Sequence, residues 1–77
     1  MKQPTQFVLC LSNRGNEASL IPGKVYALLP DTKAAEDDLV RIIDESGEDY
    51  LFPKAQFVAV EFPQAVRRKL LALQRAG

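Results

Sequence analysis

The densest group of potential metal ligands is the acidic segment at residues 44–49, which reads Asp-Glu-Ser-Gly-Glu-Asp. Carboxylate oxygens are the ligands that Ca²⁺ prefers, and a calcium loop places a bidentate glutamate at its twelfth position. In a loop that starts at Asp44, the glycine is out of place and the twelfth residue is Ala55. We therefore interpret the segment as a solvated turn and expect no metal site.

Cys10 carries the chemistry of a strong nucleophile, but the chain has no histidine to activate it. Histidine is also the commonest general base and metal ligand in proteins. Cys10 stands between Leu9 and Leu11, an apolar setting that favours a buried, unreactive thiol. Gly15 and Gly23 are isolated and form no phosphate-binding loop. The sequence thus predicts no catalytic residue and no cofactor, and we expect that the protein is not an enzyme.

The ten acidic and ten basic residues balance, but they are unevenly placed along the chain. All ten acids lie at or before Glu61. The charged residues of the tail beyond Pro63 are all basic, namely Arg67, Arg68, Lys69 and Arg75. A basic helix can bind nucleic acid by releasing counterions from the phosphates, and these four residues are the candidate contacts. The same cations can dock the tail on the acidic part of its own chain, which is the interpretation we favour.

Length and composition indicate one globular domain. A chain of 77 residues buries about 60% of the surface that its unfolded form exposes. Apolar residues make up 47% and charged residues 26%, a mixture typical of a folded protein. The single cysteine excludes an internal disulfide and fits a reducing compartment. The apolar run at residues 7–11 is too short for a signal peptide or a membrane span, so we expect a cytoplasmic protein.

Runs of β-branched and bulky apolar residues predict five short strands. The first, second and fifth cover residues 7–11, 24–29 and 57–61, and the third and fourth begin at about residues 40 and 50. Gly47 allows a tight hairpin between the third and fourth strands, because it accepts a positive φ. A polar connection at residues 31–38 has room for one helical turn at 33–36. A 3₁₀ turn precedes the last strand. Together these elements predict a mainly β domain over residues 1–62, a small and strongly bent barrel.

The tail at residues 63–77 is predicted to be an amphipathic helix. Val66, Leu70 and Leu73 recur at the i, i+4, i+7 spacing of one helical face, and Pro63 suits a helix start. An isolated helix of this length is marginal in water, so its apolar stripe must pack on the barrel or on a partner chain. The stripe has no Trp or Phe to seat in a membrane interface, so we expect no membrane binding. The oligomeric state stays open.

Two segments resemble those of SH3-like barrels. The run at residues 22–29 is similar to the SH3 segment in which glycine and a charged residue lead into a strand, and the run at 52–58 is similar to the segment with a proline and a 3₁₀ turn. The chain also resembles short uncharacterised bacterial proteins with an IDESGEDYL-type hairpin. The resemblance implies a five-stranded SH3-like barrel over roughly residues 5–62, with a C-terminal helix. The core is then expected to comprise Tyr26, Leu28, Val40, Ile42, Tyr50, Phe52, Val58 and Val60.

The resemblance also implies a ligand groove. In an SH3-like barrel, Pro53 and Phe57 face the groove, and the acidic run Glu36, Asp37 and Asp38 lies beside it. Such a groove suits a basic peptide. Proline-peptide binding is not expected, because the chain has no Trp and offers few aromatic walls. We therefore expect a non-catalytic protein-protein interaction module of the bacterial cytoplasm, whose partner the sequence does not identify and for which a basic protein segment is one candidate. The alternative is a nucleic-acid-binding accessory protein that uses the basic helix.

Overall fold

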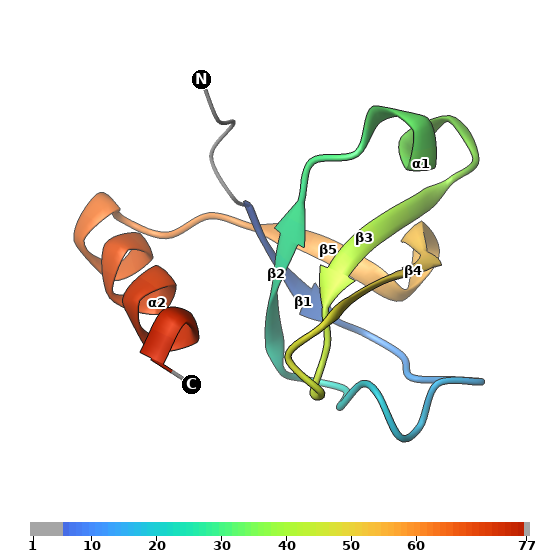
Figure 1. Ribbon diagram of the computed structural model, residues 1–77, viewed down its shortest axis with the longest axis horizontal. Coiled ribbons are helices and arrows are strands. Elements are labelled where there is room, and N and C mark those ends of the chain that lie inside the picture. The colour runs from blue at the N-terminus through green and yellow to red at the C-terminus, as the bar shows by residue number, and fades with distance from the viewer. Residues whose placement is uncertain (1–5, 77) are drawn as a thin grey trace.

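The computed structural model describes the backbone of residues 6–76 and the side-chain surroundings of residues 6–73. Within these residues, five strands and two α-helices follow one another, with one 3₁₀ turn (Figure 1). Their bounds are β1 Gln6–Cys10, β2 Val25–Leu29, α1 Thr32–Glu36, β3 Leu39–Ile43, β4 Asp49–Pro53, η1 Lys54–Gln56, β5 Phe57–Val60 and α2 Gln64–Ala76. The prediction of a mainly β chain with five strands and a C-terminal helix is confirmed.

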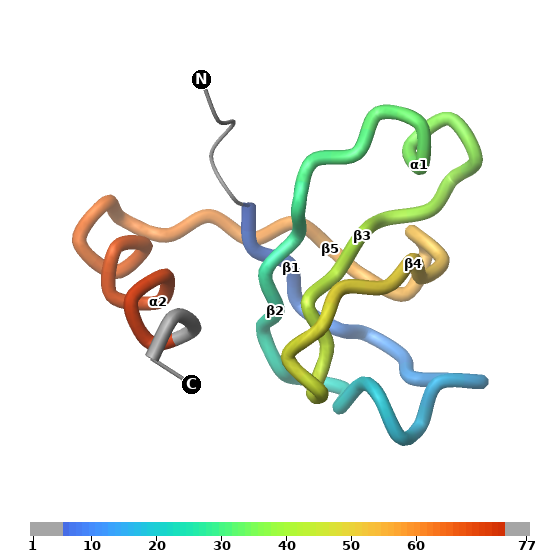
Figure 2. The backbone as a smooth tube through the Cα atoms, viewed as in Figure 1, coloured from blue at the N-terminus to red at the C-terminus, as the bar shows by residue number. Residues whose placement is uncertain are grey.

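The strands form one antiparallel sheet in the order β4-β3-β2-β1-β5. The chain path in Figure 2 shows the sheet bending, so that β4 and η1 swing back toward β5. Among the described strands, however, β4 and β5 are the two edges of the sheet and do not pair with each other. The sheet is therefore open, and the closed barrel expected from the sequence is not formed by strand pairing.

Local backbone chemistry sets the turns between these strands. Gly47 has φ +85°, and its amide donates to the carbonyl of Asp44 at 3.0 Å, which closes the β3-β4 hairpin. Asp31 caps α1 by accepting from the amide of Ala34 at 3.0 Å, and its other carboxylate oxygen accepts from Arg41 Nε at 2.9 Å. Since Arg41 lies on β3, the cap also ties α1 to the sheet.

Replacing Gly47 with valine is expected to cost about 1–2 kcal/mol of the free energy of unfolding, because an L-residue is strained at positive φ. A Cβ built at this position meets no atom within 4 Å, so the loss reports backbone conformation and not a clash. Gly47→Asn is the control, since asparagine tolerates the left-handed region better than a β-branched residue. Urea unfolding of the three proteins measures the effect, and equal losses for valine and asparagine would contradict it.

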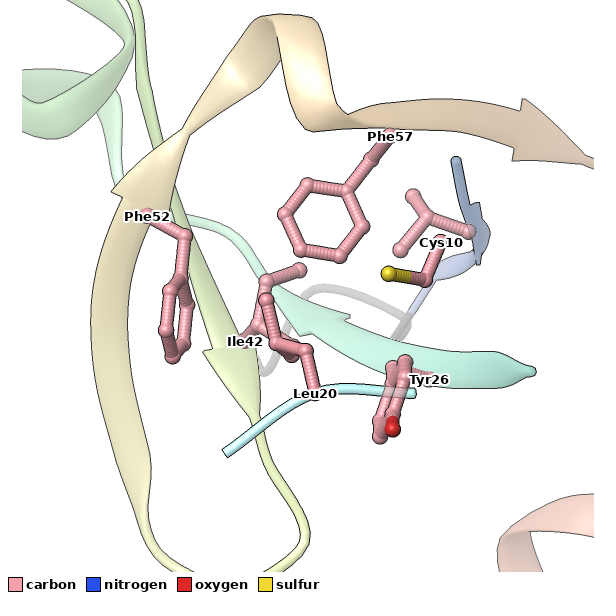
Figure 3. Close-up of a cluster of buried hydrophobic side chains, with 7 residues drawn as sticks. Cys10, Leu20, Tyr26, Ile42, Phe52 and Phe57 are labelled. Atoms are coloured by element: carbon pink, nitrogen blue, oxygen red, sulfur yellow. The ribbon is translucent and has the colours of Figure 1, made fainter. Parts of the chain in front are cut away.

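The concave face of the sheet holds the hydrophobic core (Figure 3). Tyr26, Ile42 and Phe52 were expected there and are buried, and Leu28 and Val40 pack against them. The loop between β1 and β2 contributes Leu20 to the core. The sequence patterns did not single out Leu20, because it lies outside any strand. The buried members of the cluster are Val8, Cys10, Leu20, Tyr26, Ile42, Phe52 and Phe57.

Three of the expected core residues lie elsewhere. Tyr50 is 49% exposed near the tip of the hairpin, and Val58 is 44% exposed. The register of β5 explains why Val58 is not in the core. Cys10 pairs with Phe57 and Leu9 with Val58, so Phe57 shares the inner face with Cys10. Successive side chains of a strand alternate between faces, so a shift of one residue exchanges Phe57 for Val58 in the core. Val60, which pairs with Phe7, lies on the outer face for the same reason.

The outer face of the sheet is apolar at its centre. Phe7, Ala27 and Ile43 stand opposite one another on β1, β2 and β3, and Phe7 and Ala27 are buried. Phe62 meets Phe7 edge to face with ring centroids 6.0 Å apart, just before α2 begins. In Figure 1 α2 stands beside the sheet, and Leu70 and Leu73 of the helix line a groove with Phe7 and Ile43 of the outer face. The sheet thus has apolar residues on both faces, with α2 flanking the outer one.

Candidate functional site

A groove of about 580 Å³ separates α2 from the outer face of the sheet. Its apolar surface comes from three neighbouring strands and from the helix, and consists of Phe7, Val25, Ile43, Leu70 and Leu73. Its polar rim comes from the start of β2 and from the β3-β4 hairpin, and consists of Lys24, Tyr26, Asp44, Glu45 and Gly47. A cavity of this size, with apolar walls and a few polar groups, is typical of a binding site.

The apolar walls follow from the register and from helical periodicity. Phe7 and Ile43 stand on either side of Ala27 on the outer face of the sheet, and both line the groove. Leu70 and Leu73 lie three residues apart on α2, so both face the groove. Leu73 is nevertheless 57% exposed. The groove is therefore open to solvent at Leu73, whereas Phe7 is buried and Val25, Ile43 and Leu70 are half-buried.

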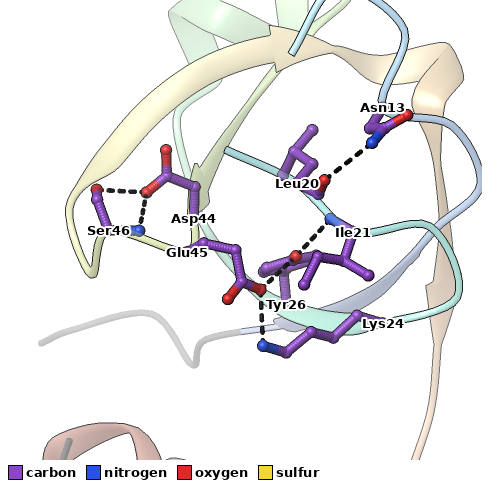
Figure 4. Close-up of polar contacts among 8 residues, drawn as sticks. All are labelled: Asn13, Leu20, Ile21, Lys24, Tyr26, Asp44, Glu45 and Ser46. Atoms are coloured by element: carbon purple, nitrogen blue, oxygen red, sulfur yellow. Dashed lines mark hydrogen bonds and ion pairs between the residues drawn. The ribbon is translucent and has the colours of Figure 1, made fainter. Parts of the chain in front are cut away.

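Side-chain hydrogen bonds fix the polar rim (Figure 4). The Tyr26 hydroxyl donates to Glu45 Oε2 at 2.6 Å and accepts from the Ile21 amide at 2.8 Å. Lys24 Nζ donates to the same carboxylate oxygen at 2.6 Å. Burial, reinforced by the bond to Glu45, raises the pKa of Tyr26. This network joins the long β1-β2 loop to the β3-β4 hairpin.

The hairpin is held by a second set of bonds around Asp44. Its buried carboxylate accepts from the Ser46 amide at 2.8 Å and from the Ser46 hydroxyl at 2.5 Å. The Glu45 amide donates to the carbonyl of Ser19 at 3.0 Å, which adds a backbone link to the β1-β2 loop. The acidic segment therefore serves to shape a turn. Within the described residues, no group of three or more potential metal-ligating side chains comes together.

The stability contributed by Glu45 is expected to depend on pH. Its hydrogen bonds from Lys24 and Tyr26 hold the pKa of Glu45 below the ordinary value of 4.5. A carboxyl group whose pKa is lowered by folding stabilises the protein above its unfolded-state pKa and loses that contribution as the pH falls through the folded-state pKa. Urea unfolding from pH 7 to pH 3 should therefore show wild type losing its advantage over Glu45→Gln below about pH 4.5. Glu36→Gln, at an exposed position, is the control; a constant gap between wild type and Glu45→Gln would contradict the link.

The groove expected from the sequence is only partly assembled. The Lys54 amide donates to the carbonyl of Asp38 at 2.9 Å, which brings Asp38 next to Pro53 at the end of β4. Glu36 and Asp37 are exposed at the end of α1. Phe57 does not face this surface: it is 9% exposed, and its ring packs edge to face on Phe52 with centroids 6.2 Å apart. The acidic residues and the proline share one end of the sheet, but the aromatic wall expected from Phe57 belongs to the core.

The basic residues of the tail are divided by the fold. Arg67 is half-buried, and its guanidinium lies 5.6 Å above the ring of Phe7, within range of a cation-π interaction. Arg68 and Lys69 are exposed. The side chain of Arg75 falls outside the part of the chain whose side chains the structure describes. Arg67 thus has a structural contact that competes with a role in phosphate binding.

The sequence did contain a signal for the groove. Residues 7–11 are continuously apolar, without the alternation of a half-buried strand. Such a run indicates a strand that is covered on both faces. Taken with the apolar stripe of the tail, it pointed to a helix-covered outer face. The sequence could not show how completely the helix covers that face, because this depends on the path of the three residues between β5 and α2.

Within residues 6–76, no helix has both the length and the apolar character needed to span a membrane. No protein-family model, no curated protein and no solved structure matches this chain.

Proposed function

We propose that this chain is a non-catalytic protein-interaction module that binds a partner segment in the groove between α2 and the outer face of the sheet. The observation that carries the proposal is the open apolar surface of Val25, Ile43, Leu70 and Leu73 in a groove of about 580 Å³. Exposed apolar surface of this kind is costly in water and marks interaction sites in soluble proteins. A partner with an apolar ridge gains free energy by covering it.

The chemistry of Cys10 supports a role without catalysis. Its thiol is buried, and burial raises the pKa of Cys10, which disfavours the nucleophilic thiolate. Its hydrogen-bond partner is the carbonyl of Ser12, at 3.4 Å, and not a base. A free and buried cysteine also supports a reducing compartment, in agreement with a cytoplasmic location.

We also propose that the open sheet is of the SH3-like type. The strand order β4-β3-β2-β1-β5 supports this assignment, as does the 3₁₀ turn η1 directly before β5. Phe52 and Phe57 lie at the two edge strands, β4 and β5, and their rings pack on each other. Side-chain packing therefore joins the two edges that backbone hydrogen bonds do not connect. The groove proposed here lies on the opposite, outer face, and the fold type does not by itself supply its function.

The polar rim indicates the charge of the partner. Asp44 and Glu45 line the groove, and Glu48 and Asp49 follow on the same hairpin. Lys24 is already paired with Glu45. Asp49 is likewise paired with Arg41, so the four carboxylates of the hairpin exceed their paired cations by two. This excess favours a segment with basic residues beside its apolar ridge, because opposite charges across an interface raise the association rate and disfavour acidic competitors. The partner we propose is therefore an amphipathic, basic segment.

An NMR titration with a synthetic leucine-lysine helical peptide tests this function. The peptide is expected to shift the methyl signals of Val25, Ile43 and Leu70, with an affinity that falls as salt is added. A peptide of the same composition with its leucines scattered around the helix is the control and should have no effect. A response confined to Glu36, Asp37 and Asp38 would place the site at the other end of the sheet and contradict the proposal.

The same titration with a short oligonucleotide tests the alternative, nucleic-acid binding. Arg68 and Lys69 are the exposed cations of α2 that the structure describes, and they would shift first. Few phosphate contacts give weak and strongly salt-dependent binding. Tight binding at physiological salt that is lost in an Arg67→Ala, Arg68→Ala double variant would favour this alternative over protein interaction.

A further inference from the structure

The apolar stripe of α2 is incompletely covered by its own sheet. Val66 is 43% and Leu73 57% exposed, although both belong to the stripe that defines the helix as amphipathic. The contacts that hold the helix lie near its beginning, where Phe62 and Arg67 meet Phe7. A helix of 13 residues is marginal in water and depends on packing of its apolar face. The stripe therefore offers apolar surface at Val66, in the first turn of α2, and at Leu73, farther along the helix, which a further element can cover.

The groove and α2 have complementary properties. The groove suits an apolar ridge with basic flanks, because its walls are apolar and its rim carries two carboxylates, Asp44 and Glu45, against one cation, Lys24. α2 has the stripe of Val66, Leu70 and Leu73, and its polar residues nearest to that stripe include Lys69. The helix contains no acidic residue, and the hairpin beside the groove carries four. Apolar character and charge thus match between the groove of one copy and the helix of another.

We infer that the groove is occupied by α2 of a second copy of this chain, so that two copies form a symmetric dimer. In a two-fold arrangement each copy contributes one helix and one groove, and every contact is made twice. Leu73 of one copy then packs near Val25 and Ile43 of the other, and apolar surface of each stripe is covered. This inference rests on the proposed function, because it uses the same groove and names its occupant.

The interface is small. α2 is about 20 Å long, given a rise of about 1.5 Å per residue, and each copy offers one helix and one groove. Contacts of this extent fall at the lower end of the size range of specific interfaces. The dimer is therefore expected to dissociate on dilution, and its stability to fall as salt screens Lys69 from the acidic hairpin.

Sedimentation equilibrium of the full chain tests the dimer, from micromolar to near-millimolar concentration. Leu73→Asp should weaken dimerisation by about tenfold or more, since it buries a carboxylate in an apolar interface. Ala72→Asp is the matched control: it adds the same charge to the same exposed turn but on a side of the helix turned away from the stripe, and it should dimerise like the parent. A parent chain that is monomeric throughout, or equal weakening by both variants, would overturn the inference.

A second measurement assigns the contacts and separates the two proposals. In a mixture of ¹³C-labelled and unlabelled chains, isotope-filtered NOEs are expected between Leu73 of one copy and Val25 or Ile43 of the other. A dimer without these contacts overturns the inference. A monomer whose groove binds the leucine-lysine peptide also overturns it but leaves the proposed function standing. The third outcome is a dimer with these contacts whose dissociated chains, at low concentration, do not bind the peptide. It supports the inference and contradicts the broader function.

Discussion

A Phe57→Ala variant is expected to lose about 3–5 kcal/mol of its free energy of unfolding, whereas Val58→Ala should lose less than about 1 kcal/mol. The two residues are neighbours on β5, but Phe57 is 9% exposed within the core and Val58 is 44% exposed on the opposite face. Truncation of a buried phenylalanine removes its transfer free energy and leaves a cavity beside Phe52. The comparison of neighbours therefore measures the register of β5 directly.

Urea unfolding followed by circular dichroism gives both values. A domain of this size has only about 5–15 kcal/mol of stability, so the Phe57→Ala chain is expected to be partly unfolded at 37 °C. Phe57→Leu is a useful third variant, because it keeps most of the apolar volume and should recover much of the loss. Should Val58→Ala prove the more damaging change, β5 would have the register expected from the sequence alone, and the core would have to be redrawn.

The strands and the C-terminal helix were predictable because their signals are local. Gly47 supplies the positive φ of the hairpin, and its neighbours place a run of polar residues between two apolar strands. Pro63 and the spacing of Val66 and Leu70 define the start and the face of α2. Each of these features depends on residues close together in the chain.

The register of β5 was not predictable in this way. The run Phe57-Val58-Ala59-Val60 is apolar at both odd and even positions, so periodicity does not say which face is buried. The choice is made by pairing with β1, where Cys10 stands opposite Phe57. That pairing joins segments nearly fifty residues apart, and no local pattern records it.

The candidate site was harder to predict than the fold. The expected groove at Glu36, Asp37 and Asp38 relied on Phe57 as an aromatic wall, and the register of β5 places Phe57 in the core instead. The groove beside α2 combines residues from β1, β2, β3, the hairpin and the helix. Its existence depends on the position of α2 relative to the sheet, which is a property of the three-dimensional arrangement.

A Tyr26→Phe variant is expected to lose about 1–3 kcal/mol of its free energy of unfolding, although it removes a single oxygen atom. The hydroxyl accepts from the Ile21 amide at 2.8 Å and donates to Glu45 Oε2 at 2.6 Å, in a part-buried setting. Phenylalanine leaves the amide without this acceptor and deprives the carboxylate of one of its donors. The loss of a bond partner costs most where water cannot easily replace it.

Tyr50→Phe is the matched control for this change. The Tyr50 hydroxyl donates to Glu48 Oε1 at 2.8 Å, but Tyr50 is 49% exposed, so water can replace the bond and the loss should stay within about 0.5 kcal/mol. A double-mutant cycle of Tyr26→Phe with Glu45→Gln, measured by urea unfolding, should give a coupling energy of about 0.5–3 kcal/mol. Additive losses would contradict a shared network. The rim of the groove would then be held by the backbone bond from Glu45 to Ser19 and by the Asp44 turn, with no measurable coupling between Tyr26 and Glu45.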